Sequence, residues 1–138
     1  MIKYKESKKI SDKDLRPLYE SISWHYAGKY SDLSVILENS YLVYSAWDGD
    51  RLVGLVRTVG DGLSIQYVQD ILILPEYKKL GIGKELLRYA LEKSEHIRQF
   101  ALITGSSEEN RYVLDWYEKQ GLRPFEKDEI KGFWRVKI

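Results

Sequence analysis

The sequence contains no cysteine, and its two histidines, His25 and His96, stand far apart along 138 residues. The absence of thiols excludes disulfides, thiolate metal ligands and a cysteine nucleophile. Two distant histidines do not make a zinc-ligand pattern, so we expect no metal site. The chemistry of this chain must depend on other side chains and on the backbone.

Long apolar runs and an excess of one charge are also missing. No run approaches the length that crosses a bilayer, and the first nine residues, MIKYKESKK, lack the apolar core of a signal peptide. A net charge of +1, from 22 basic and 21 acidic residues, creates no field that favours nucleic acid or an anionic membrane. We therefore expect a cytoplasmic protein with neither a nucleic-acid nor a membrane partner.

Linkers rich in proline, glycine or serine, internal repeats and low-complexity tracts are absent as well. The length suits one domain with a respectable core and is too short for two full domains. We expect a single domain over residues 1–138, with one functional site.

Periodicity and turn residues predict the order of the elements. Strands are expected at 2–6, 41–47, 51–59, 68–74 and 100–105, with two more inside 121–138, and helices at 11–22, 32–38, from 84 onward and at 106–120. Strand 68–74 is apolar except for Gln69 and Asp70, as in a central strand covered on both faces. The order predicts an α/β (α+β) fold: a mixed, mostly antiparallel sheet of about seven strands with helices on both faces.

A turn with two glycines, YKKLGIGKELL at 77–87, joins that central strand to the next predicted helix. Backbone N–H groups at a helix start lack partners and point outward at the positive end of the helix dipole. Gly81 and Gly83 lack a Cβ, so backbone can approach an anion closely, and neighbouring lysines add positive charge. By itself the turn is explained equally well as a phosphate cradle or as a tight connection.

Two common phosphate motifs do not fit this turn. The dinucleotide fingerprint needs a glycine where Leu86 stands, and the nucleotide P-loop needs serine or threonine where Glu85 stands. The stretch Lys78-Lys79-Leu80-Gly81-Ile82-Gly83 instead resembles the signature Arg/Gln-x-x-Gly-x-Gly/Ala of the GNAT superfamily of acetyl-coenzyme A-dependent N-acetyltransferases, with lysine in its first position. The resemblance covers nearly the whole order of elements and is strongest from Asp70 to Leu122.

The resemblance implies acetyl-coenzyme A as co-substrate. Residues 79–84 would bind its pyrophosphate, and strand groups at 71–73 would hydrogen-bond its pantetheine arm in a gap beside the next strand. The implied cofactor-binding residues are Ile71, Leu72, Ile73, Lys78, Lys79, Leu80, Gly81, Ile82, Gly83, Lys84 and Asn110.

A later segment, ENRYVLDWYEKQGLRPF, is similar to the second signature of the family. Seven residues make two helical turns, so Asn110, Leu114 and Tyr117 share one helix face. Taken alone, Tyr117 is a packing residue and Asn110 a helix cap. The resemblance implies that Asn110 contacts the cofactor and that Tyr117 is the general acid that protonates the departing thiolate.

The proton acceptor stays open between Asp70, Tyr67 and water. Strict alternation puts Tyr67, Gln69, Ile71 and Ile73 on one face of their strand and Asp70 on the other, unless a bulge changes the register. Asp70 is as well explained as a structural hydrogen-bond acceptor.

The acceptor pocket implied by the resemblance contains Trp24, Tyr26 and Tyr30, together with Tyr67 and Gln69 from the strand. Aromatic walls of this kind suit a compact amine, although the same side chains also suit packing. The segments RLVGLVRTVGDG and QDILILP are similar to small GNAT proteins that include plant serotonin acetyltransferases, which favours small amines.

The expected function is transfer of the acetyl group of acetyl-coenzyme A to a primary amine of a small molecule, by direct attack in a ternary complex. The alternatives are a non-catalytic acyl-coenzyme A-binding or regulatory module, and a protein N-acetyltransferase. Family members are often homodimers, and the terminal FWRVKI offers an edge for such pairing.

Overall fold

A computed structural model describes residues 1–22, 27–108 and 111–137. The chain divides into two compact units, Met1–Ile103 and Thr104–Ile138. Three residues expected at the site, Trp24, Tyr26 and Asn110, lie outside the described residues.

The first unit holds a five-stranded sheet in the order β1-β2-β3-β4-β5. Its strands are β1 (Ile2–Glu6), β2 (Leu42–Asp48), β3 (Arg51–Gly60), β4 (Ile65–Ile73) and β5 (Gln99–Leu102). The first four pair antiparallel, with short turns between β2 and β3 and between β3 and β4 and a longer connection from β1 to β2, and β5 runs parallel to β4. A parallel pair needs a crossover, which here contains a helix. The mixed, mostly antiparallel sheet is therefore confirmed.

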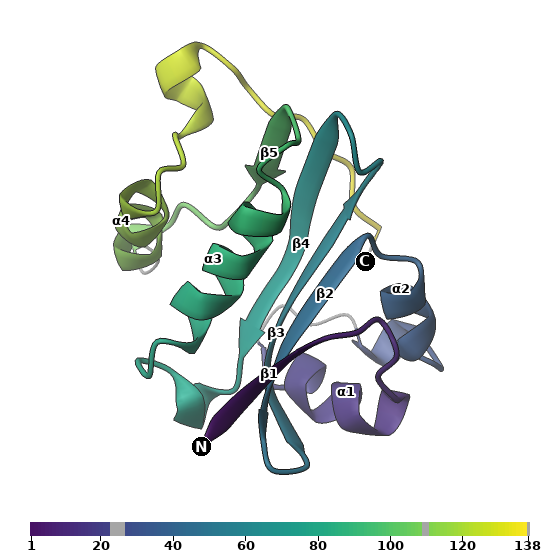
Figure 1. Cartoon of the computed structure of the whole chain (residues 1–138). Coiled ribbons are helices and arrows are strands. Elements are labelled where there is room, and N and C mark those ends of the chain that lie inside the picture. The colour runs from purple at the N-terminus through teal and green to yellow at the C-terminus, as the bar shows by residue number, and fades with distance from the viewer. Residues whose placement is uncertain (23–26, 109–110, 138) are drawn as a thin grey trace. The chain divides into compact units, whose positions relative to one another are not determined.

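Helices cover both faces of this sheet: α3 (Ile82–Lys93) lies on one face, and α1 (Asp12–Glu20) and α2 (Ser34–Glu38) on the other (Figure 1). Burial agrees, because every residue from 52 to 58 of β3 is buried, as in a strand covered on both faces. The predicted cap of α1 is confirmed, since the Ser11 side chain accepts a hydrogen bond from the N–H of Asp14 at 3.2 Å.

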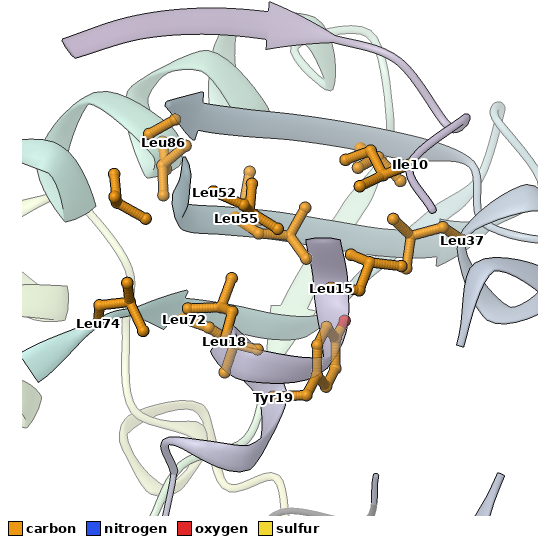
Figure 2. Packing of buried hydrophobic residues seen from close by; sticks show 14 of the residues in the cluster. Ile10, Leu15, Leu18, Tyr19, Leu37, Leu52, Leu55, Leu72, Leu74 and Leu86 are labelled. Carbon is orange, nitrogen blue, oxygen red and sulfur yellow. The ribbon is translucent and has the colours of Figure 1, made fainter. Parts of the chain in front are cut away.

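The core between α1 and the sheet is built from large aliphatic side chains. Leu15 and Leu18 of α1 are fully buried, as is Leu55 of β3, and Leu72 of β4 belongs to the same cluster (Figure 2). Burying such a side chain stabilises the fold by about 1.5–3 kcal/mol. This packing holds α1 against β3 and β4, the strands that carry the candidate site.

The second unit contains α4 (Arg111–Lys119) and a short 3-10 turn, Phe125–Asp128. Residues 129–137 form neither helix nor strand, so the two terminal strands predicted inside 121–138 are wrong for the described residues, and the described sheet has five strands rather than about seven. An isolated two-stranded hairpin is marginally stable in water at best. The apolar pattern of this segment is therefore insufficient by itself to form strands within the unit.

Element boundaries differ modestly from the sequence prediction. β4 begins at Ile65 rather than at Val68, α3 begins at Ile82 rather than at residue 84, and β5 ends at Leu102. The element types in the first unit are otherwise those predicted.

Candidate active site

The pairing of β3 with β4 shifts register in the middle of the strands. Arg57 pairs with Asp70, whereas the next residue, Thr58, pairs with Val68, so Gln69 is an extra residue in β4. Such a bulge changes which side chains share a face. The strand is regular on both sides of Gln69.

This shift corrects the expected placement of Tyr67. Cross-strand partners lie on the same face of a sheet, so Tyr67, opposite Val59, shares a face with Asp70, opposite Arg57. Strict alternation had placed Tyr67 on the opposite face, with Ile71 and Ile73. The extra residue in β4 is the physical reason for the difference.

The two faces are identified by their helices. A Cβ added to Gly54 would lie 3.1 Å from a methyl group of Ile82, so the face of Gly54 and its partner Ile73 is covered by α3. The hydroxyl of Tyr19 in α1 donates to Asp70 at 2.8 Å, so the face of Asp70 is covered by α1. Tyr67 therefore stands on the α1 face.

β4 and β5 pair over only part of their length. The ladder runs from Ile65–Gln99 to Val68–Leu102 and stops there, while β4 continues to Ile73. Beyond Val68, alternate N–H and C=O groups of β4 face the side on which β5 has ended. An extended ligand can add to a strand edge of this kind through main-chain hydrogen bonds.

The turn from β4 to α3 presents backbone donors. Two of its residues have left-handed backbone, Lys79 with φ 65° and Gly81 with φ 84°. No N–H group of residues 79–84 donates to an acceptor among the described residues. Gly81 is the N-cap residue of α3, and no side-chain hydrogen bond caps this end of the helix. Successive N–H groups in such a conformation form a concave anion site at the positive end of the helix dipole.

The side chains of this turn fall into two groups. Those of Lys78, Lys79, Leu80 and Lys84 are exposed, whereas Ile82 is buried. Ile82 is therefore a packing residue and offers only its backbone to a ligand. The three exposed ammonium groups add positive charge around the N–H groups.

The residues expected to bind the pantetheine arm also divide by face. Ile71 and Ile73 are partly buried on the α3 face, and Leu72 is buried on the α1 face against the core. Leu72 can therefore contact a ligand through its backbone but not through its side chain.

Asp70 belongs to a buried ion pair. Its Oδ2 accepts from Arg57 Nε at 2.8 Å and from the Tyr19 hydroxyl at 2.8 Å, and its side chain is fully buried. This buried carboxylate is engaged by groups of the core rather than presented to a substrate. The contacts agree with the structural explanation of Asp70.

The phenol of Tyr67 forms a hydrogen bond with the backbone of Ile103. Burial is the main cause that raises the pKa of its phenol, a backbone hydrogen bond from Ile103 acts in the opposite direction, and the charge of Asp70 raises the pKa further. The phenol therefore stays protonated at neutral pH. Gln69 is exposed beside it.

A second ion pair shapes the segment that carries Tyr30. Arg16 of α1 binds Asp12 at 2.7 Å and donates to the carbonyl oxygens of Ala27 and Tyr30 at 3.0 and 2.9 Å. Asp12 in turn accepts from the N–H of Leu33 at 2.7 Å. These bonds tie the segment after residue 26 to α1, and the Tyr30 side chain is left 46% exposed.

In the second unit, Tyr117 is the buried side chain among the described residues, at 9% exposure. Its ring lies 5.1 Å from that of Trp116 between centroids. Burial raises the pKa of Tyr117 to about 12, which keeps the phenol protonated at neutral pH. Protonation suits a general acid and a packing residue alike.

Sequence reasoning missed the partners of Asp70 and the role of Arg16. A signal for the first was present, because Asp70 is the one charged residue of β4, and Arg57 is the one charged residue of β3 beyond its first residue, Arg51. Buried charges of opposite sign in neighbouring strands are expected to pair. No local pattern marked Arg16, whose carbonyl partners lie 11 and 14 residues away.

Neither a metal site nor a membrane span is found in the described part of the chain. Over residues 1–22, 27–108 and 111–137, no group of three His, Cys, Asp or Glu residues could hold a metal ion. No described helix is long and apolar enough to cross a membrane.

The fold and the turn agree with a known family. The family model of the Acetyltransferase (GNAT) family matches residues 8–122, and the chain belongs to this family. A GNAT-family acetyltransferase from Streptococcus pneumoniae is 32% identical, with a TM-score of 0.85 over 99% of this chain and 98% of that chain. The sequence resemblance to the GNAT superfamily is thus confirmed.

Two further proteins are similar to this chain at different levels of sequence identity. A protein from Prochlorococcus marinus described as an "uncharacterized N-acetyltransferase ycf52-like" is 29% identical over 127 residues, which cover 88% of this chain and 67% of that protein. The structure of AAC(6')-Iy in complex with a bisubstrate analogue, CoA-S-monomethyl-acetylneamine, has a TM-score of 0.70 at 17% identity, over 100% of this chain and 99% of that chain. At this identity the likeness shows the fold alone.

Proposed function

We propose that this chain transfers the acetyl group of acetyl-coenzyme A to the primary amine of a small-molecule acceptor by direct attack in a ternary complex. The observation that carries the proposal is the turn after β4, where residues 79–84 present backbone N–H groups without acceptors among the described residues. The turn directly follows the part of β4 that β5 leaves unpaired. A pyrophosphate and an extended amide-bearing arm need these two features side by side.

The described residues fit the co-substrate. The N–H groups of residues 79–84, with Lys78, Lys79 and Lys84, would bind the pyrophosphate, and the β4 backbone at 71–73 would bind the pantetheine arm. In AAC(6')-Iy a coenzyme A analogue occupies a protein of the same fold, which supports this assignment. Asn110 completes the proposed set of contacts.

Acetyl-coenzyme A supplies a thioester whose carbonyl carbon is attacked by a neutral amine, so that a C–N bond forms and the C–S bond breaks. A β4 backbone N–H near Ile71 would donate to the carbonyl oxygen as negative charge develops there. Tyr117, with a pKa of about 12, would donate its proton to the departing thiolate and regain one from solvent.

We assign to water the role of accepting the proton that the attacking amine loses. Asp70 is committed to Arg57 and Tyr19, and the phenol of Tyr67 is protonated. If water takes this proton, or if the amine binds already neutral, no side chain is needed as a base. Tyr67, Gln69 and Tyr30 would then contact the acceptor, with Trp24 and Tyr26 as further proposed contacts.

The lack of a free carboxylate on β4 also favours a second candidate, a non-catalytic acyl-coenzyme A-binding module. That module would bind acetyl-coenzyme A without transferring the acetyl group to any amine. A screen of compact amines that monitors thiol release separates the two candidates, because only the transferase gives acetylated amine and free coenzyme A in equal amounts.

The binding site itself is tested by calorimetric titration with acetyl-coenzyme A. Gly81→Val places a β-branched residue at φ 84°, which L residues rarely adopt, and should weaken binding at least about tenfold by turning the N–H groups. Gly49→Val is the matched control, because Gly49 also has positive φ and no atom within 4 Å of an added Cβ. Absent binding by the parent protein, or equal losses in both variants, would contradict the proposed site.

A further inference from the structure

The Arg57–Asp70 ion pair is more deeply buried than any other ion pair between described residues of the first unit. The side chains are 8% and 0% exposed, whereas those of Arg51–Glu76 are 54% and 55% exposed. Removing two charges from water costs several kcal/mol for each, and well-packed apolar residues often give equal or greater stability. The stability of the core alone does not explain this pair.

The pair connects four segments of the first unit. Arg57 of β3 and Asp70 of β4 are cross-strand partners, Tyr19 of α1 donates to Asp70, and Arg57 donates to the Ser40 hydroxyl after α2 at 3.2 Å. Ser40 in turn donates to the carbonyl of Ile36 in α2 at 2.9 Å. The network therefore relates β4 to β3 and to both helices on its face.

The Arg57–Asp70 pair lies directly next to the bulge in β4. Arg57–Asp70 is the last pair in register before the extra residue, Gln69, and Tyr67 lies two residues beyond Gln69, after Val68. A slip of β4 by one residue would move every side chain to the other face. Asp70 would then face α3, whose buried residues Ile82, Leu86, Leu87 and Ala90 are all apolar.

That alternative register is strongly disfavoured because it buries an unpaired carboxylate. The same slip would leave Arg57 without its charge partner. A buried ion pair at this place thus discriminates between registers, a use of buried polar groups for which there is good precedent.

We infer that Arg57 and Asp70 are positioning residues that fix the register of β4 at the bulge. They thereby determine the face on which Tyr67 stands and the direction of the backbone N–H groups from Gln69 to Ile71. This inference rests on the proposed function only for its kinetic consequence, since the register itself is measurable without turnover.

The test replaces both charges by apolar side chains of similar length, Arg57→Met with Asp70→Leu. We expect the double variant to fold, with backbone amides from Gln69 to Ile71 exchanging with solvent at least about tenfold faster than in the parent. The value of kcat should fall at least about tenfold, because small displacements of reacting groups cost large factors in rate. Binding of acetyl-coenzyme A should persist, because the 79–84 turn lies outside the network, but its Kd should rise as well, because the adjoining backbone at 71–73 is proposed to hold the pantetheine arm.

The matched control is the same pair of substitutions at an exposed Arg–Asp pair, Arg123→Met with Asp128→Leu. Those side chains are 65% and 46% exposed, and exchange at residues 69–71 and kcat should keep their parent values. If the buried double variant does not fold, Asp70→Asn preserves the shape of the side chain and replaces it in the same comparison. It should show the same faster exchange and lower kcat.

Two results would overturn the inference. Parent-like exchange at residues 69–71 in a folded variant means that the pair does not hold the register, whatever happens to kcat. Faster exchange with parent-like kcat means that the register does not position the reacting groups. If the parent transfers no acetyl group to any amine, the proposed function fails, and the exchange measurement still decides the register.

Discussion

A Cβ atom added to Gly83 would lie 2.9 Å from Cδ1 of Ile73, the last residue of β4. The second glycine of the turn therefore lets the first turn of α3 pack closely on the strand proposed to hold the pantetheine arm. The first glycine has a different role, because an added Cβ at Gly81 would meet no atom within 4 Å but its φ is 84°. The two glycines of one motif are required for two different physical reasons.

The contact between Gly83 and Ile73 predicts that the two positions are coupled in a double-mutant cycle. In the parent, Gly83→Ala should leave the stability of the fold nearly unchanged, because the new methyl group must displace Cδ1 of Ile73 and this cost offsets the gain in helix propensity. After Ile73→Val, which removes Cδ1, the same change should stabilise by roughly 0.5–1 kcal/mol, since alanine is the better helix former. Urea unfolding of the four proteins measures the cycle, and equal effects in both backgrounds would disprove the contact.

Tyr117→Phe tests the proposed general acid. Loss of the phenolic proton donor should lower kcat by about 10²–10⁴-fold while the Kd for acetyl-coenzyme A stays within about twofold. Tyr112→Phe is the control, because Tyr112 is on the same helix but 69% exposed, and its variant should keep the parent rate. Parent-like turnover of Tyr117→Phe would remove this residue from the mechanism.

The raised pKa of Tyr117 also predicts how stability depends on pH. The phenol has a pKa of about 12 in the folded protein and about 10 when unfolded, so the fold favours the protonated form. This contribution is fully present below pH 10 and is lost as pH rises through 12, because the unfolded chain releases its proton first. Tyr89, whose pKa is also raised to about 12, mainly by partial burial and then by Glu6, adds to the same loss.

Urea unfolding between pH 9 and pH 12 checks this dependence. Tyr117→Phe should lose less stability over that interval than the parent, and Tyr112→Phe should lose as much as the parent. Identical alkaline losses in the parent and Tyr117→Phe would mean that the Tyr117 phenol titrates alike in both states.

Arg16→Ala should affect the acceptor and not the co-substrate. Without its bonds to the carbonyls of Ala27 and Tyr30, the segment that carries Tyr30 is no longer held against α1. The KM for the amine should rise several-fold, because the segment must then be ordered when the amine binds, at the expense of binding free energy. The Kd for acetyl-coenzyme A should be unchanged, and Lys13→Ala, an exposed change on the same helix, should alter neither constant.

The homodimer expected from the sequence stays a prediction, and the terminal segment is where it is tested. Phe133 and Trp134 are 90% and 76% exposed, and exposed apolar side chains of this size are common at interfaces between subunits. Light scattering over a range of concentrations should give twice the chain mass, and Phe133→Ser with Trp134→Ser should return the monomer. A parent that is monomeric at every concentration would rule out this interface.

Several features were predictable because they are local. The Ser11 cap, the hairpin at Gly49 and the glycine turn each depend on residues within a few positions, and all three occur where the sequence predicts them. The strand expected near FWRVKI has the same apolar pattern as the true strands. It is not formed among the described residues, because a strand needs a neighbouring backbone as well as a suitable sequence.

The sequence by itself determined the order of elements in the first unit, the motif that places backbone donors at the start of α3, and through these the family. The tertiary structure alone decided that Gln69 is extra in β4, that Tyr67 consequently shares a face with Asp70, and that Asp70 is bound to Arg57 and Tyr19. The physical reason is that propensity and turn chemistry act over neighbouring residues. Strand register is decided by which side chains, tens of positions apart, are buried together, and no periodicity within β4 contains that information.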